Sequence, residues 1–294
     1  MTSAFEFRGV TRRYGRVVAL DDVTLAVPRR SIVGLIGRNG SGKSTLLRHV
    51  TGMLLPHSGE CITLGTNSAR LGRDELSRVG VVEQVGVLLP WMRGEQLLRY
   101  VATFYERWDV ELERTLVRDL EVDTHTRVMA LSPGNRQRLA LVLASCHHPE
   151  LLLLDEPLSD LDPIARQGVL AMLLERFSSD DVTIVISSHM LRDIEPVVDR
   201  VVCLDRGRVT ADDELDVLAE RYAEWIVTSP EGRLPEAFSE PWVATSHGDR
   251  FRARLVVRDA AVSAHTFGEG YGATVERRAL NLERLFPLLT GAAR

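Results

Sequence analysis

Lysine is almost absent from this chain of 294 residues. Of its 36 basic side chains, 35 are arginine and only one, Lys43, is lysine. The 41 acidic side chains leave a formal net charge of -5. Domains that bind nucleic acid by neutralising its phosphates are usually basic, so this balance argues against a nucleic-acid partner.

Cysteine is also scarce, and long apolar runs are missing. Cys61, Cys146 and Cys203 are widely spaced and form no CxxC pair, so neither a disulfide framework nor a zinc site is predicted. No run reaches the roughly 18 to 20 consecutive apolar residues that a membrane-spanning helix needs. Residues 1–8 lack the basic start and apolar middle of a secretory signal. We therefore expect a protein of a reducing, cytoplasmic compartment.

Apolar segments of strand length alternate with helical patterns along most of the chain. The segments that we predict as strands are 5–9, 23–27, 31–36, 79–83, 151–155, 182–187 and 200–204. The patterns between them that are typical of helices cover 43–53, 163–177 and 190–199. Continuous apolar strands suit burial on both faces, and the alternation predicts an α/β fold with a mainly parallel sheet.

Two regions depart from this alternation. Between about residues 90 and 148, three helical patterns follow one another without a strand, at 94–108, 111–120 and 133–146. We interpret this region as a helical insertion. After a connecting helix at 212–223, three further segments alternate like strands, at 224–228, 241–245 and 251–257. A helix with an Asn cap at 281–290 follows. We predict a first domain over 1–214 and a small C-terminal α+β domain over 215–294.

A glycine-rich loop lies between the predicted strand 31–36 and the helix that follows it. It matches the pattern G-x-x-x-x-G-K-[ST] and consists of Gly37, Arg38, Asn39, Gly40, Ser41, Gly42, Lys43, Ser44 and Thr45. Such glycines let successive backbone N–H groups cradle phosphate oxygens, and the positive end of the helix dipole adds to the attraction. Lys43 is expected to reach the β- and γ-phosphates of ATP, and Ser44 to bind Mg²⁺. The single lysine supports this interpretation, because an arginine fork is too broad for such a cradle.

Two carboxylates, Asp155 and Glu156, end the apolar strand 151–155. A parallel sheet delivers the ends of its strands to one edge, where ligands bind in open α/β sheets. Asp155 is therefore expected to hold Mg²⁺ through water, and Glu156 to polarise the water that attacks the γ-phosphate. The alternative is a strand end capped by acids, which is common in isolation but less so beside a phosphate loop.

With these motifs, residues 4–210 resemble the nucleotide-binding subunit of an ABC transporter. Further motifs follow the order of that family: Tyr14, Gln84, the signature-like segment 131–135, the segment 159–162, and His189 after Ser187 and Ser188. The resemblance implies an ABC-type P-loop fold with N-terminal antiparallel strands and a helical subdomain. It also implies that Tyr14 stacks on adenine, that Gln84 contacts Mg²⁺ and the attacking water, and that His189 contacts the γ-phosphate.

The signature-like segment departs from the family's commonest form. Pro133 and Asn135 stand where that form has Gly and Gln. Ser132 can cap a helix whose first residue is Pro133. The resemblance implies that Ser132 and Gly134 approach the nucleotide, and it leaves the role of Asn135 open.

The resemblance implies an ATPase that uses ATP and Mg²⁺ and forms a head-to-tail pair with a copy of itself or a similar chain. Its expected partner is a separate multi-spanning membrane permease, which places it peripherally on the inner face of the cell membrane. The segments 104–109 and 282–286 resemble exporters with a small C-terminal domain. The aromatic residues Trp91, Phe104, Tyr105 and Trp108 are either a docking face for the permease or core.

Two alternatives lie in other classes. A soluble mechanical ATPase of the same superfamily, acting on ribosomes or DNA, usually carries two nucleotide modules or a long coiled coil, and neither pattern occurs here. A P-loop kinase would not need the signature or the Ser-Ser-His segment.

Overall fold

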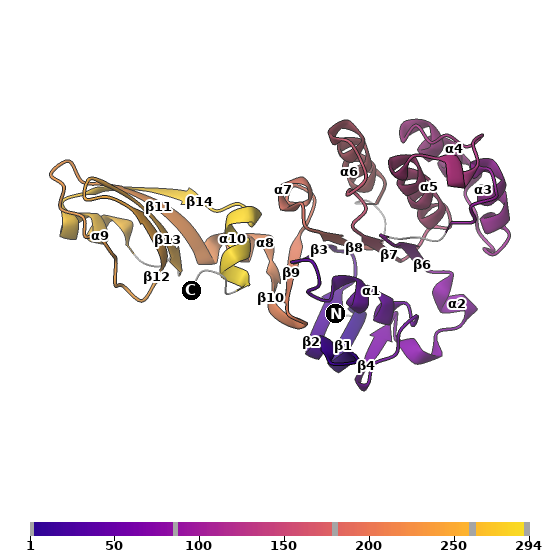
Figure 1. Cartoon of the computed structure of the whole chain (residues 1–294), viewed down its shortest axis with the longest axis horizontal. Coiled ribbons are helices and arrows are strands. Elements are labelled where there is room, and N and C mark those ends of the chain that lie inside the picture. The colour runs from indigo at the N-terminus through magenta and orange to yellow at the C-terminus, as the bar shows by residue number, and fades with distance from the viewer. Residues whose placement is uncertain (1–2, 85–87, 178–181, 259–262, 291–294) are drawn as a thin grey trace. The chain divides into compact units, whose positions relative to one another are not determined.

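The structure is a computed structural model that describes residues 3–84, 88–177, 182–258 and 263–290 (Figure 1). These residues form two compact units, Met1–Asp212 and Asp213–Arg294, which divide close to the domain boundary expected at residue 214. Among the described residues, no helix is both long and apolar enough to cross a membrane.

The first unit begins with an antiparallel sheet. Its strands are β1 (Ser3–Tyr14), β2 (Val17–Pro28), β4 (Ser58–Thr63) and β5 (Thr66–Asn67), in the order β2-β1-β4-β5. Side chains alternate along β1, so that Phe5 and Phe7 are buried while Arg8 is exposed and pairs with Glu6 and Glu60. One face of this sheet therefore supplies core, and the other meets solvent.

A six-stranded sheet forms the centre of the unit. Its order is β10-β9-β3-β8-β7-β6, and its strands are β3 (Ile32–Gly37), β6 (Val79–Val82), β7 (Leu151–Asp155), β8 (Thr183–Ser188), β9 (Arg200–Asp205) and β10 (Arg208–Glu214). The neighbours from β9 to β6 run parallel. Every residue of β3, β7 and β8 is buried, as the continuous apolar runs predict. These three strands end at one edge of the sheet.

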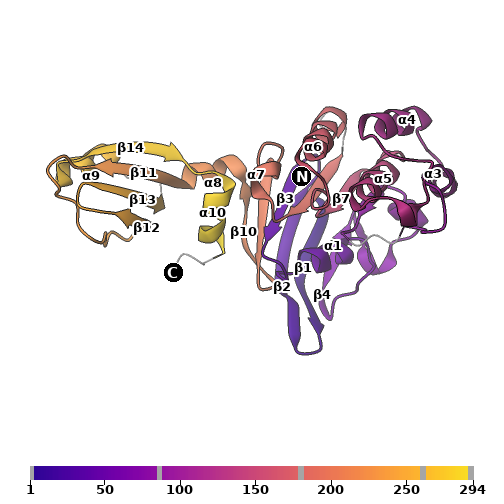
Figure 2. The same ribbon diagram turned by 45° about the horizontal axis from the view of Figure 1, so that its top comes forward.

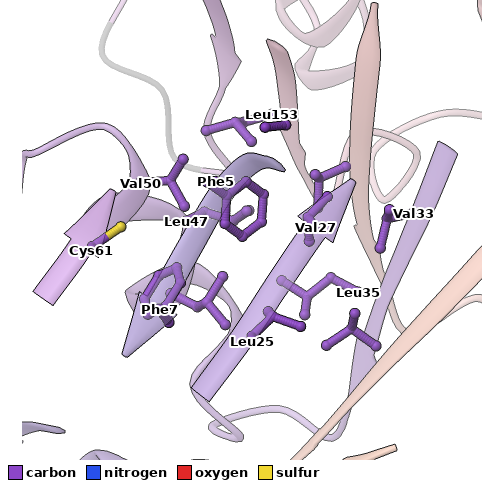
Figure 3. Packing of buried hydrophobic residues seen from close by; sticks show 14 of the residues in the cluster. Phe5, Phe7, Leu25, Val27, Val33, Leu35, Leu47, Val50, Cys61 and Leu153 are labelled. Atoms are coloured by element: carbon purple, nitrogen blue, oxygen red, sulfur yellow. The ribbon is translucent and has the colours of Figure 1, made fainter. Parts of the chain in front are cut away.

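Helix α1 (Lys43–Val50) and the antiparallel sheet share one core with this central sheet (Figure 3). Phe5 and Phe7 of β1 meet Leu47 and Val50 of α1 there, and Leu153 reaches the same cluster from β7. This packing fixes α1, and with it the loop that precedes the helix.

Helices fill the chain between β6 and β7. In this stretch the described residues form no strand. They form the helices α3 (Gly94–Ala102), α4 (Val110–Asp119) and α5 (Pro133–Ser145). The Asp109 side chain caps α4 by accepting from Leu112 N at 2.8 Å. The other α-helices among the described residues of this unit are α2 (Arg73–Leu76), α6 (Pro163–Phe177) and α7 (Leu191–Ile194).

Several expected boundaries were wrong. The helix expected over 94–108 ends at Ala102, and a new helix starts only after the Asp109 cap. The helix expected over 190–199 covers only Leu191–Ile194, because Pro196 has no N–H with which to continue the helical hydrogen bonds. The elements that had no sequence prediction are β4, β5, α2 and β10, and in the second unit α9 and β14.

The second unit is an α+β arrangement around a four-stranded antiparallel sheet. Its elements are α8 (Leu215–Arg221), β11 (Tyr222–Thr228), β12 (Val243–Gly248), β13 (Arg252–Arg258), α9 (Ala264–Tyr271), β14 (Thr274–Ala279) and α10 (Leu282–Leu289). The strand order is β12-β13-β11-β14, and Figure 2 shows the sheet from a second direction. The two units together confirm the predicted α/β class with its added α+β part.

Aromatic side chains make the core of the second unit. Trp225 is buried, and its ring centroid lies 5.3 Å from that of Trp242 and 5.4 Å from that of Phe267. Phe267 stands on α9 and also meets Tyr271 and Phe238. Helix α9 is thereby held against β11.

Replacing Trp225 by alanine should lower the free energy of unfolding of the second unit by about 3–5 kcal/mol, because it opens a cavity in this aromatic core. Chemical denaturation of the full chain, followed by circular dichroism, measures the loss. The control is Trp91→Ala, whose exposed ring should cost less than about 0.5 kcal/mol. Equal effects of the two variants would contradict the assigned core.

Candidate active site

The edge where the parallel strands end gathers most of the predicted site. β3, β8, β7 and β6 are neighbours in that order, so the phosphate loop, His189, the two carboxylates and Gln84 all follow adjacent strand ends. This is the edge at which open α/β sheets bind ligands.

The phosphate loop tolerates no side chain at two of its glycines. A Cβ on Gly37 would collide with Leu204 O and Ser41 Oγ. Gly42 has φ 112°, and a Cβ there would lie 2.5 Å from Ala19 O. The backbone is therefore packed closely on its own unit, and its shape is set before any ligand arrives.

Backbone hydrogen bonds at Ser41 also hold the loop. Ser41 N donates to Arg38 O at 3.0 Å, and Ser41 O accepts from Gly207 N at 2.9 Å. The Ser41 hydroxyl is buried and has no partner among the described residues. An unpartnered buried hydroxyl next to N–H groups at a helix start fits a loop built for an anionic ligand.

Lys43 lies inside this loop with 7% of its side chain exposed. Its Nζ donates to Gly37 O at 2.9 Å and lies 3.6 Å from Glu156 Oε1. The Glu156 side chain is only 6% exposed, so the two charges form a buried ion pair. The loop that should receive phosphate is thus joined to the carboxylate that should activate water.

Ser187, whose role the sequence did not reveal, holds the carboxylate of Asp155 and the backbone of Glu156. Ser187 Oγ donates to Asp155 Oδ1 at 2.5 Å and accepts from Glu156 N at 2.9 Å. The parallel register places Asp155 opposite Ser187. The only sequence signal was the position of Ser187 two residues before His189, and the pairing register was not readable there.

His189 contacts the same glutamate. Its Nδ1 lies 2.7 Å from Glu156 Oε2, and its backbone N donates to that oxygen at 3.4 Å. Glu156 has a left-handed backbone, φ 51°, which is uncommon for a residue other than glycine. The carboxylate therefore stands between Lys43 on one side and His189 on the other.

The donor set at the strand ends suits Mg²⁺. Ser44 and Asp155 line one small cavity of about 10 Å³ at the start of α1 and the end of β7. Mg²⁺ prefers oxygen ligands and often takes one carboxylate together with substrate phosphates. These two residues could hold the ion in this way.

The remaining predicted residues lie further out. Gln84 follows β6 and is exposed, as are Arg38, Asn39 and Gly40 of the loop. Tyr14 ends β1 as an exposed ring, and the Arg12 guanidinium lies 5.1 Å from its centroid. The carbonyl oxygen of Thr45 lies 2.7 Å from His49 Nδ1, at hydrogen-bond distance, and this contact anchors the first turn of α1. The adenine role of Tyr14 stays a prediction.

Ser132 and Gly134 stand at the start of α5, in the helical region. Ser132 Oγ caps the helix by accepting from Asn135 N at 3.2 Å, and Pro133 occupies the first helical position. The sequence predicts both features. The Asn135 side chain at this turn accepts a hydrogen bond from Asp123 N, within the helical region. Lys43, in contrast, donates to Gly37 O at the end of β3.

Comparison with known proteins gives the same family. A family model described as ABC transporter matches residues 20–159. Nod factor export ATP-binding protein I of Rhizobium johnstonii is 31% identical over 242 residues, covering 80% of this chain and 77% of that protein. This chain belongs to the ATP-binding proteins of ABC transporters.

Two further members of the family agree with this assignment. Aliphatic sulfonates import ATP-binding protein SsuB 1 of Burkholderia cenocepacia is 33% identical over 211 residues, or 71% of this chain and 63% of that protein. A solved ATP-binding subunit of an ABC transporter superposes with a TM-score of 0.67 at 30% identity, covering 74% of this chain and 92% of that one. The predicted ABC ATPase family and its P-loop fold are confirmed. ATP binding and hydrolysis are the activities that this family shares.

Lys43→Arg should lower ATP affinity or turnover by about tenfold or more, because the planar fork cannot take the place of a slim ammonium beside Gly37 O. Fluorescent-nucleotide titration and phosphate release measure the two effects. Arg114→Lys, on the exposed side of α4, is the matched exchange and should change neither. Unchanged ATPase activity of Lys43→Arg would refute this account of the loop.

Proposed function

We propose that this chain hydrolyses ATP as one half of a dimer that drives a separate membrane permease, on the cytoplasmic face of the membrane and in the direction of export. The observation that carries the proposal is the buried contact of Glu156 with both Lys43 and His189. This contact brings the cation that would bind phosphate, Lys43, together with the proposed base, Glu156, and the imidazole of His189 at one edge of the sheet.

The chemistry assigned to these side chains follows from their positions. Arrival of the phosphates of ATP gives Lys43 stronger partners than Gly37 O, and Glu156 then loses its ion pair and can accept a proton from water. His189 holds the second oxygen of Glu156 and so fixes the direction of the carboxylate. Ser44, Asp155 and Gln84 would hold Mg²⁺, which supplies positive charge to the β- and γ-phosphates.

A second subunit is needed to complete the site. The chain has one phosphate loop and one signature-like segment, and the segment begins a helix of the helical region, where Ser132 caps α5. We assign Ser132 and Gly134 to the nucleotide held by another subunit, either a copy of this chain or a similar ATPase. ATP would then close the pair, and hydrolysis would open it.

A cavity on the first unit is the proposed seat of the permease. It has a volume of about 350 Å³ and is lined by α2, the segment after α3 and the residues before β7. Phe104 is exposed at its rim, while Tyr105 stacks on the buried His147 with ring centroids 4.1 Å apart. Of the four aromatics considered from sequence, Phe104 therefore suits docking, and Tyr105 belongs to the wall.

The lengths of the matches to two relatives support export as the direction of transport. The match to the Nod factor export protein spans 242 residues and 80% of this chain, and the match to the sulfonate importer spans 211 residues and 71%. This favours export.

Glu156→Gln should reduce ATP turnover by about a hundredfold or more, since an amide cannot accept the proton of the attacking water. ATP binding should persist within a few-fold, because the loop keeps its backbone N–H groups and Lys43, and the ion pair that the variant removes is one that the phosphates of ATP would displace. Phosphate release and nucleotide titration measure the two properties. The control is Glu60→Gln, an exposed carboxylate of the antiparallel sheet. Normal ATP hydrolysis by Glu156→Gln would contradict the assignment of Glu156 as the base.

Purification from membranes solubilised in mild detergent should retain a multi-spanning protein, identified by mass spectrometry. Phe104→Glu should lose it while keeping ATP binding, because a charge replaces the exposed aromatic ring at the rim of the cavity. Phe251→Glu is the matched control, with 53% of the residue exposed against 54% for Phe104. Recovery of ribosomal proteins or DNA in place of a membrane protein would favour a soluble mechanical ATPase.

A further inference from the structure

The side chain of Asn135 is turned into the helical region. It is buried, its Oδ1 accepts from Asp123 N at 3.0 Å, and its Nδ2 donates to Glu121 O at 3.4 Å. Both ends of the amide are therefore used on the turn that follows α4. A buried amide with both groups paired this way is not free to reach a ligand.

A second side chain of α5 holds the same turn. Arg138 lies three residues after Asn135, on the same side of the helix, and its Nη1 donates to Leu120 O at 2.8 Å. Glu121 between these contacts has φ 50°, a left-handed backbone. The three hydrogen bonds thus fix a tight turn that a residue other than glycine adopts at some cost.

The opposite side of the first turn of α5 is also fixed. A Cβ on Gly134 would lie 2.8 Å from Asp160 O, so the backbone of the signature-like segment packs directly on the segment after β7. The Ser132 cap bonds to Asn135 N. Asn135 is thus the residue through which the cap, the first turn and the α4–α5 turn are joined.

We propose that Asn135 is a positioning residue, which holds Ser132 and Gly134 in place for the nucleotide of the other subunit by tying α5 to the turn at residues 121–123. This inference rests on the proposed pairing of two subunits. Asn135 replaces the glutamine of the commonest signature, and its shorter side chain reaches Asp123 N at hydrogen-bond distance. Its contribution to turnover is made without contact with ATP.

The test uses ATP-dependent dimer formation of the full chain in the Glu156→Gln background, where ATP is bound but not consumed. Analytical ultracentrifugation with and without ATP gives the dimer dissociation constant, and fluorescent ATP at low protein concentration gives the affinity of the subunit's own loop. Asn135→Ala should weaken the dimer about tenfold or more, because displaced groups lose complementarity. It should leave the affinity of the loop unchanged.

Companion variants separate the outcomes. Arg138→Ala removes the third bond to the turn and should act in the same direction, while Arg118→Ala, exposed on α4, should change nothing. Thermal melting confirms that each variant is folded. An unaltered dimer constant in Asn135→Ala, or a changed affinity of the loop, would overturn the proposal.

The same experiment tells this failure from failure of the proposed function. If the Glu156→Gln protein itself does not dimerise with ATP, the pairing of subunits is wrong. If it dimerises and Ser132→Ala weakens the dimer while Asn135→Ala does not, the pairing stands and only the role of Asn135 is refuted.

Discussion

The buried ion pair between Lys43 and Glu156 is the constraint on which the rest of the site depends. Two charges with less than a tenth of their surface exposed lie 3.6 Å apart. Removing such charges from water is costly, and the cost is offset only when each has further partners. Gly37 O provides one for Lys43, and His189 provides one for Glu156. The geometry of the whole strand edge serves to keep these four groups together.

That geometry is produced by packing far from the charges. β3, β8 and β7 are buried along their full length and pair in parallel register, so their ends cannot slide relative to one another. The register places Ser187 beside Asp155, and the Ser187 hydroxyl then holds one carboxylate and the backbone N of the other. The core of Figure 3 holds α1 in the same way, which places Lys43 at the start of that helix.

The sequence predicts those parts of the molecule that a local pattern defines. The loop at 37–45, the carboxylates at 155 and 156 and the buried strands all have such a pattern. Ser187 and Asn135 do not, because the role of each is set by a residue distant in the chain, Asp155 in one case and Asp123 in the other. The strands β4, β10 and β14 were not predicted, for a related reason. They are short or polar segments that neighbouring strands stabilise, and β-propensity alone does not define them.

The scarcity of lysine follows from the same physics. Arginine in this protein pairs with carboxylates through its fork, as Arg78 does with both oxygens of Glu150 at 2.6 and 2.7 Å. Such a fork needs a planar partner and open space beside it. Lys43 instead donates to one carbonyl and faces one carboxylate oxygen inside a closely packed loop, where the walls include the backbone of Gly37. A chain whose other 35 basic side chains are all arginine therefore keeps lysine at the single place where a point charge must fit.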